Sequence, residues 1–224
     1  MELRELLGVK PGVTAIIGSG GKTTMLDALA EELSRRGRVL CCTTTHIRVP
    51  THLPVLTDPG REELLRAAEA YPCLCAGSAA EEGKLGALSI PLEALAERWD
   101  YVLVEADGAR GLPLKAHAPY EPVVPPCAGR TVLVAGCAGL GQPIRDAVHR
   151  PEIFCRLAGC SPEDIASPEA VAAALRAEGL GDLVFLNQAD SPQRRSAGLE
   201  LAKKLDRPAL MGALKRKEWE ACAL

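Results

Sequence analysis

A glycine-rich segment with a lysine and two threonines, Gly18-Ser19-Gly20-Gly21-Lys22-Thr23-Thr24, is the part of this sequence best suited to chemistry. Glycines allow successive backbone N–H groups to converge on an anion without obstruction by side chains. A lysine reaches the outer phosphates of a nucleotide, and a threonine hydroxyl such as that of Thr23 binds Mg²⁺. The segment therefore predicts a phosphate loop that binds ATP or GTP together with Mg²⁺.

The spacing of this loop departs from the common pattern G-x-x-x-x-G-K-[ST], which would place its first glycine at the position of Ile16. The loop instead resembles the shorter G-x-x-G-K-T-T form found in Mur ligases. We expect a buried strand at 13–17 before the loop and a helix at 23–36 after it, whose N-terminal dipole would favour an anion. A glycine-rich turn that binds nothing is the alternative, and the strand–loop–helix order favours the phosphate loop.

Two carboxylates, Glu105 and Asp107, follow the apolar run 101–104, for which we predict a strand. Residues two apart in an extended backbone point to the same side. Beside a triphosphate, and with the hydroxyl of Thr23, such a pair holds Mg²⁺ or orients an attacking water. We therefore predict metal-binding and catalytic roles for both acids. A solvated turn is the alternative, because Asp-Gly is a common turn pair.

The segment Asn187-Gln188-Ala189-Asp190 resembles the base-reading N-K-x-D element of GTPases. We predict that Asn187 and Asp190 contact the nucleotide. Gln188 stands where that element has the lysine that packs along the base, so the choice between ATP and GTP stays open. A helix N-cap at Asp190 or Ser191, just before Pro192, is the alternative interpretation.

Other polar side chains lie close to the predicted strand ends. His46 follows three threonines, and contact with a phosphate, metal or substrate would give it a catalytic role. For Thr45, Arg110 and Lys115 we predict contacts with a substrate or partner, since arginine and lysine donate hydrogen bonds to anionic groups. The alternatives are a structural histidine and ordinary surface charges.

The elements that must position these residues alternate along the chain. Apolar runs predict strands at 13–17, 38–42, 55–57, 73–75, 85–88, 101–104, 131–134, 183–186 and 209–211, and helical spacing predicts helices at 23–36, 62–70, 92–98, 151–158, 168–177 and 192–205. The proline-rich stretch 113–126 is expected to be a long ordered loop. This alternation predicts one α/β domain over residues 1–224, with a single open, mostly parallel sheet covered by helices on both faces, of the P-loop NTPase type. Ligands of such sheets bind beyond the carboxyl ends of the strands, where the three polar clusters begin.

Composition limits the class of protein. The chain has 224 residues, a net charge of -3, 47% apolar residues and nine cysteines. No apolar stretch approaches the roughly 20 residues that cross a bilayer, and no long basic run is present, so we expect a soluble cytoplasmic protein without membrane or nucleic-acid partners. The cysteines form no CxxC pair and are expected to be reduced. For Cys41 and Cys42, inside an apolar run, we expect buried hydrophobes, and a metal-binding or redox thiol among the nine is the alternative.

Several stretches together resemble the YqeC-like family of selenium-dependent hydroxylase accessory proteins. They are Ile17-Gly18-Ser19-Gly20-Gly21-Lys22-Thr23-Thr24, Thr43-Thr44-Thr45-His46-Ile47, the segment from Val104 to Ala116, Glu121-Pro122-Val123-Val124-Pro125, Val148-His149-Arg150-Pro151-Glu152 and Leu186-Asn187-Gln188-Ala189-Asp190. The resemblance implies a P-loop fold and a role in maturing molybdenum hydroxylases that carry labile selenium, with the hydroxylase or its cofactor as a partner. Gln188 and His117 depart from the family pattern, in which we expect lysine and proline.

Three activities remain open at this stage. The first is a maturation factor that hydrolyses a nucleoside triphosphate, as a Mg²⁺-dependent NTPase. The second is an ATP-dependent ligase or kinase acting on a small acid or hydroxyl, which the Mur-like loop suggests. The third is a nucleotide-binding switch module without chemistry of its own.

Overall fold

The computed structural model describes residues 1–81 and 83–222, in which strands and helices alternate. The fold class is α/β with a large, mostly parallel mixed sheet flanked by helices, as predicted, and it is consistent with the P-loop NTPase type. The chain divides into two compact units. Unit 1 comprises Met1–Ile16, Met25–Gly108 and Val123–Thr131, and unit 2 comprises Ile17–Thr24, Ala109–Pro122 and the chain from Val132 onward. A single domain over 1–224 stays a prediction.

Parallel strands form the centre of unit 1. They are, in spatial order, β1 (Gly12–Gly18), β7 (Tyr101–Glu105), β2 (Val39–Thr43) and β5 (Cys73–Ala79), with β4 (Val55–Thr57) also parallel to β5. Two antiparallel strands, β6 (Lys84–Gly86) and β3 (His46–Arg48), extend the edge beyond β5. Glu105 is in register with both Ile16 and Thr43, so the carboxyl ends of three strands meet at one edge.

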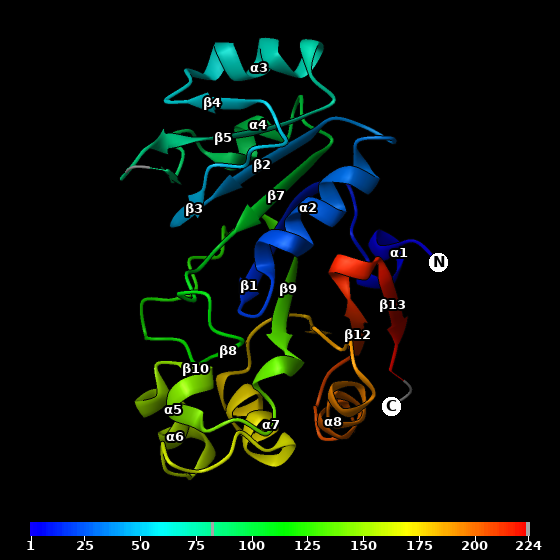
Figure 1. The fold of residues 1–224 in the computed structure, drawn as a ribbon. Coiled ribbons are helices and arrows are strands. Elements are labelled where there is room, and N and C mark those ends of the chain that lie inside the picture. Colours follow the sequence, from blue (N-terminus) through cyan, green and yellow to red (C-terminus); the bar gives the residue numbers. More distant parts are fainter. Residues whose placement is uncertain (82, 223–224) are drawn as a thin grey trace. The chain divides into compact units, whose positions relative to one another are not determined.

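The helices of unit 1 are α1 (Leu3–Leu7), α2 (Lys22–Leu33, in this unit from Met25), α3 (Arg61–Ala70) and α4 (Leu92–Leu95). Figure 1 shows α3 lying along β4 and β5. Leu64 of α3 and Leu95 of α4 share one buried cluster with Trp99 and with strand residues such as Leu74 and Val102. Continuous apolar runs are typical of strands covered on both faces, and this is the pattern from which the strands were predicted.

Unit 2 contains three parallel strands, β9 (Ala128–Gly136, in this unit from Val132), β11 (Leu183–Asn187) and β12 (Ala209–Ala213), and the antiparallel strand β13 (Glu218–Ala221). A separate parallel pair is formed by β8 (Leu114–Lys115) and β10 (Val148–His149). β8 lies inside the stretch 113–126, which therefore includes a short strand as well as loop.

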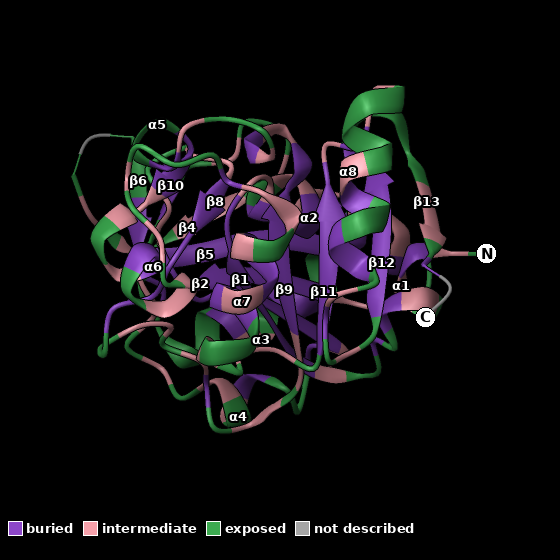
Figure 2. Cartoon of the chain, turned by 90° about the horizontal axis from the view of Figure 1, so that it is seen from below, coloured by how far each residue is buried: buried purple, intermediate pink, exposed green. Residues whose placement is uncertain are grey.

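The helices of unit 2 are α5 (Ile144–Ala147), α6 (Pro151–Ala158), α7 (Pro168–Glu178) and α8 (Pro192–Ala202), with short 3₁₀ turns η1 (Cys137–Gly139) and η2 (Leu214–Arg216). α7 packs against both α6 and α8. Ser191 caps α8, because its hydroxyl accepts a hydrogen bond from the N–H of Arg194. Figure 2 shows β11 and β12 buried, whereas β13 and much of α8 are intermediate or exposed.

Four short strands were not predicted from the sequence: β3, β8, β10 and β13. Each has two to four residues, which is too short to show an apolar run or an alternation. Within residues 1–81 and 83–222, none of the helices combines the length and apolarity that crossing a bilayer requires.

Candidate functional site

The loop Gly18–Thr24 joins β1 to α2 and belongs to unit 2. The N–H of Ser19 donates to the carbonyl oxygen of Val134 at 2.8 Å, which ties the start of the loop to β9. Lys22 turns back into the loop, because its Nζ donates to the carbonyl oxygen of Gly18 at 2.7 Å and the residue is only 5% exposed. The lysine ammonium is thus held inside the loop that we predicted to bind phosphate.

Close approach by neighbouring groups explains the glycines of the loop. Gly20 and Gly21 have φ angles of 80° and 130°, which L side chains rarely adopt. A Cβ atom at Gly20 would lie 2.5 Å from the nitrogen of Gly136, and one at Gly21 would collide with the side-chain amide of Asn187. The loop therefore requires glycine at both positions, for conformation and for space.

Asn187, the last residue of β11, fastens this loop to a second strand end. Its Nδ2 donates to the carbonyl oxygen of Gly20 at 2.8 Å, and its Oδ1 accepts from the N–H of Leu214 at 3.1 Å. The side chain is buried, at 4% exposure. Both ends of the amide are therefore engaged in positioning the loop, a role that the N-x-x-D pattern did not predict. The predicted contact with a base stays a prediction.

Asp190 lies just before α8 and makes an ion pair with Arg194 in the first turn of that helix. Nη1 of Arg194 lies 2.7 Å from Oδ1 of Asp190, and both side chains are partly exposed. This hydrogen bond, with a smaller contribution from Arg216, lowers the pKa of Asp190. A guanine base would have to share this carboxylate with Arg194.

Both predicted catalytic carboxylates in unit 1 are buried, with Glu105 7% and Asp107 0% exposed. The carbonyl oxygen of Glu105 accepts hydrogen bonds from Oγ1 of Thr43 at 2.7 Å and from the N–H of Thr44 at 3.2 Å. Ala106 continues the pairing with β1, since its N–H donates to the carbonyl oxygen of Ile16 at 3.0 Å. Because both side chains are buried, the alternative of a solvated turn is wrong. Burying a carboxylate is costly unless it is paired. Titratable groups in such perturbed surroundings cluster at functional sites.

The threonines before His46 bind backbone and each other. Oγ1 of Thr44 donates to the carbonyl oxygen of Val123 at 2.7 Å, and the hydroxyls of Thr43 and Thr45 lie 3.4 Å apart. His46 is exposed at the start of β3, opposite Gly86 of β6. The catalytic role of His46 and the substrate role of Thr45 stay predictions.

Lys115 and Arg110 have different surroundings in unit 2. Arg110 is exposed and has a φ of 49°. Lys115 is buried, and its Nζ lies 2.8 Å from Oε2 of Glu121, whose Oε1 lies 3.1 Å from Nη2 of Arg150. The interpretation of Lys115 as an ordinary surface charge is therefore wrong.

Sequence reasoning missed several members of this polar region. Glu121 and Arg150 were not predicted as site residues, and neither was the pair of His117 with Glu178, whose Nδ1 and Oε2 atoms lie 3.0 Å apart. The available signal was weak: Glu121 and Arg150 each stand directly before a proline, inside segments that resemble the family.

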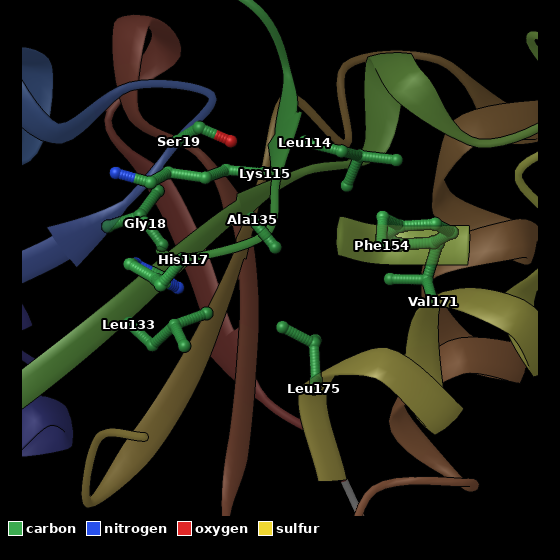
Figure 3. A pocket seen from close by; sticks show the side chains of 11 residues that line it. Gly18, Ser19, Leu114, Lys115, His117, Leu133, Ala135, Phe154, Val171 and Leu175 are labelled. Atoms are coloured by element: carbon green, nitrogen blue, oxygen red, sulfur yellow. The ribbon is translucent and has the colours of Figure 1, made fainter. Parts of the chain in front are cut away.

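A small cavity of about 10 Å³ lies against the loop, lined by Gly18, Ser19, Lys115 and His117 and by apolar side chains. Figure 3 shows Phe154, Val171 and Leu175 on its helical side. Its volume suffices for about one water molecule, and the buried Oγ of Ser19 has no hydrogen-bond partner among the described residues.

A larger hollow of about 500 Å³ opens between η1 and the first turns of α7 and α8. Leu140, Gln142, Ile165, Ser191 and Arg194 are among its lining residues. This volume is in the range of small-molecule sites, and the hollow lies in unit 2, as the phosphate loop does.

The cysteines are unpaired thiols, and seven of the nine are buried. Burial is the main cause that raises the pKa of both Cys75 and Cys137 to about 12. Among residues 1–81 and 83–222, no group of three His, Cys, Asp or Glu side chains is arranged to hold a metal ion. The seven buried thiols pack as small hydrophobes.

An α/β chain in which a glycine loop joins a buried strand to a helix, with a buried lysine at the end of the loop, is consistent with the P-loop NTPase type of protein. A family model described as YqeC protein matches residues 14–152. The uncharacterized protein YqeC of Escherichia coli (strain K12) is 38% identical over 162 residues, which are 69% of this chain and 63% of that relative. The chain therefore belongs to the YqeC family, as its motifs predicted, and the match spans less than two thirds of the relative's length.

Proposed function

We propose that this chain binds a nucleoside triphosphate at Gly18–Thr24 and hydrolyses it. The observation that carries the proposal is Lys22, whose buried ammonium donates to the carbonyl oxygen of Gly18. Taking a charged group out of water is unfavourable unless strong partners surround it. Lys22 lies inside a glycine loop at the start of a helix, where an anion is favoured. When an anion binds, Nζ of Lys22 would donate to it instead of to the carbonyl oxygen of Gly18.

Different residues of the loop are assigned different contacts with the phosphates and the metal ion. Since the N–H of Ser19 is engaged by Val134, we assign the phosphate contacts to the amides from Gly20 to Thr24 and to Nζ of Lys22. Thr23 is exposed, and we assign its hydroxyl to Mg²⁺. On the sequence pattern alone we also propose that Glu105 and Asp107, which are buried in unit 1, bind the ion or orient an attacking water. Mg²⁺, when bound, neutralises charge on the phosphates.

Base selection by this site is proposed to be weak, with ATP bound at least as well as GTP. The support comes from Asp190 and Asn187, the two residues that would read guanine. The first shares its carboxylate with Arg194, and the second uses both ends of its amide on the backbone of Gly20 and Leu214. The hollow beside Arg194 has room for a base of either kind.

Calorimetry with ATP and GTP in the presence of Mg²⁺ tests the assignment. Lys22→Ala is expected to weaken both nucleotides by about a hundredfold or more, roughly 2.7 kcal/mol, because it removes a charge-assisted hydrogen bond to phosphate. The matched control is Lys10→Ala, which removes an exposed lysine and should leave both affinities unchanged. Equal affinities in Lys22→Ala and the parent would refute the phosphate loop.

Product analysis separates the three activities. Release of free phosphate with no second substrate supports hydrolysis, and turnover that requires a second substrate supports the ligase or kinase. Nucleotide binding without turnover supports the switch module. Each outcome follows from the same purified protein with each nucleotide and Mg²⁺.

On the family resemblance we further propose that the protein acts in the maturation of selenium-dependent molybdenum hydroxylases. Deleting its gene is then expected to lower hydroxylase activity without lowering the amount of hydroxylase polypeptide. The wild-type chain should restore activity, and the Lys22→Ala form should not. A deletion strain with full activity and normal selenium content in the hydroxylase would contradict this role.

A further inference from the structure

Four polar side chains from three segments converge at the pair β8–β10 in unit 2. The parallel register places His149 opposite Lys115, and the N–H of Ala116 donates to the carbonyl oxygen of His149 at 3.0 Å. Arg150 follows directly, at the N-cap of α6. The carboxylate of Glu121 lies between Lys115 at 2.8 Å and Arg150 at 3.1 Å. We call Lys115, Glu121, His149 and Arg150 the β8–β10 cluster.

His149 has an incomplete set of contacts within this cluster. Its Nδ1 is buried and has no hydrogen-bond partner among the described residues. Three cations, Lys115, Arg150 and Arg110, and one carboxylate, Glu121, are the charged groups that act on its ring. Burial, followed by these cations, lowers the pKa of His149. The surroundings of the imidazole therefore carry more positive than negative charge, and they favour the approach of an anion.

Arg150 has an unusual backbone conformation at the N-cap of α6. Its φ of 66° lies in the left-handed region, which residues other than glycine rarely adopt. In this conformation the guanidinium contacts Glu121 and lies over the ring of Tyr120, at 5.3 Å from the ring centre. Tyr120 is 73% exposed, so Arg150 contacts a solvent-accessible ring on one side and, on the other, the carboxylate of Glu121 that also binds the buried Lys115. A guanidinium has five N–H donors, more than the contact with Glu121 uses.

We propose that Arg150 and His149, with Lys115 behind them and Tyr120 at the rim, bind the carboxylate or phosphate oxygens of a second small molecule. A planar guanidinium next to an imidazole matches the fork of such an oxyanion. Lys115 also lines the small cavity against Gly18 and Ser19, so one buried lysine connects the β8–β10 cluster with the phosphate loop. The identification of this anion as the second substrate of the nucleotide reaction rests on the proposed function. The binding of an anion at the β8–β10 cluster is independent of it.

The test uses the full chain with Lys22→Ala, so that the phosphate loop does not compete for the anion. Histidines labelled with ¹³C and ¹⁵N are followed by NMR during pH titrations in orthophosphate, in acetate and in chloride at matched ionic strength. His149→Gln identifies the His149 signal. An oxyanion that prefers the imidazolium form tenfold raises the pKa of His149 by about one unit. We expect this rise in phosphate, in acetate or in both, but not in chloride, and no comparable change at His46 or His52.

Three substitutions in the same background sharpen the test. Arg150→Ala should abolish the rise, and Glu121→Gln should lower the half-saturating anion concentration several-fold, because it removes the carboxylate that competes for Arg150. Arg145→Ala, the matched control, removes an exposed arginine of α5 that pairs with Asp146 and should change nothing. Comparison of the titrations in acetate and in orthophosphate distinguishes a carboxylate site from a phosphate site.

The outcomes separate this proposal from the proposed function. No rise in either oxyanion, an equal rise in folded Arg150→Ala protein, or weaker binding in Glu121→Gln would each overturn the subsite. If the parent binds no nucleotide by calorimetry while the rise at His149 occurs, the anion subsite stands and the proposed nucleotide reaction falls.

Discussion

Asn187→Ala should destabilise the protein and loosen the phosphate loop together. The substitution removes the amide that donates to the carbonyl oxygen of Gly20 at 2.8 Å and accepts from the N–H of Leu214 at 3.1 Å. A buried polar group that loses its partner costs about 1–3 kcal/mol, so two such groups should lower the free energy of unfolding by about 3 kcal/mol. For a chain of 224 residues, each kcal/mol shifts Tm by roughly 2–4 °C, which gives a fall of about 6–12 °C.

Thermal unfolding followed by circular dichroism measures the first effect, and calorimetry with ATP and GTP measures the second. Both nucleotides should lose affinity to the same extent, because the lost contact supports the loop and not the base. Asn187→Asp keeps an acceptor for Leu214 but places a carboxylate against the carbonyl of Gly20, so its nucleotide affinity should fall similarly. Ser196→Ala removes an exposed hydroxyl of α8 and serves as the matched control. An unchanged Tm, or a loss confined to GTP, would refute the positioning role.

Four more outcomes are expected. Asp107→Asn and Glu105→Gln should weaken Mg²⁺-dependent binding or turnover more than metal-free binding, and unchanged metal dependence in both would remove them from the site. In competition the parent should not favour GTP over ATP by as much as a hundredfold, or roughly 2.7 kcal/mol. Arg194→Ala should raise relative GTP affinity by no more than about fivefold, since an exposed ion pair is weak. With Ellman's reagent, the partly exposed Cys127 and Cys160 should react before the seven buried thiols, which should react after unfolding.

Longer strands and helices were predictable from the sequence because each carries its own local signal. The run 101–104 is apolar throughout because β7 is buried along its whole length, and the spacing of Met25, Leu26, Leu29 and Leu33 follows the buried side of α2. The short strands gave no such signal. β8 and β10 exist because they pair with each other, and that pairing joins two distant parts of the sequence.

The candidate site shows the same division between local and distant information. The glycine loop and Lys22 were visible in the sequence because the chemistry of phosphate binding requires contiguous residues. The role of Asn187 was not visible, because the N-x-x-D pattern does not specify what its amide faces. Glu121 and Arg150 were missed for a related reason: their contact forms only when the segments around β8 and β10 come together.

Burial adds an argument that neither motif nor topology supplies. Nine polar or charged side chains are buried among the described residues, and six of them, Ser19, Lys22, Glu105, Asp107, Lys115 and Asn187, were predicted from chemistry alone to form the site. Desolvating a charged side chain costs several kcal/mol, and replacing a buried ion pair by apolar residues is often neutral or stabilising. Stability alone therefore gives little reason for the fold to keep two lysines and two carboxylates out of water. A requirement for charge at fixed positions does give a reason, and binding a triphosphate, its metal ion and a second anion would impose that requirement.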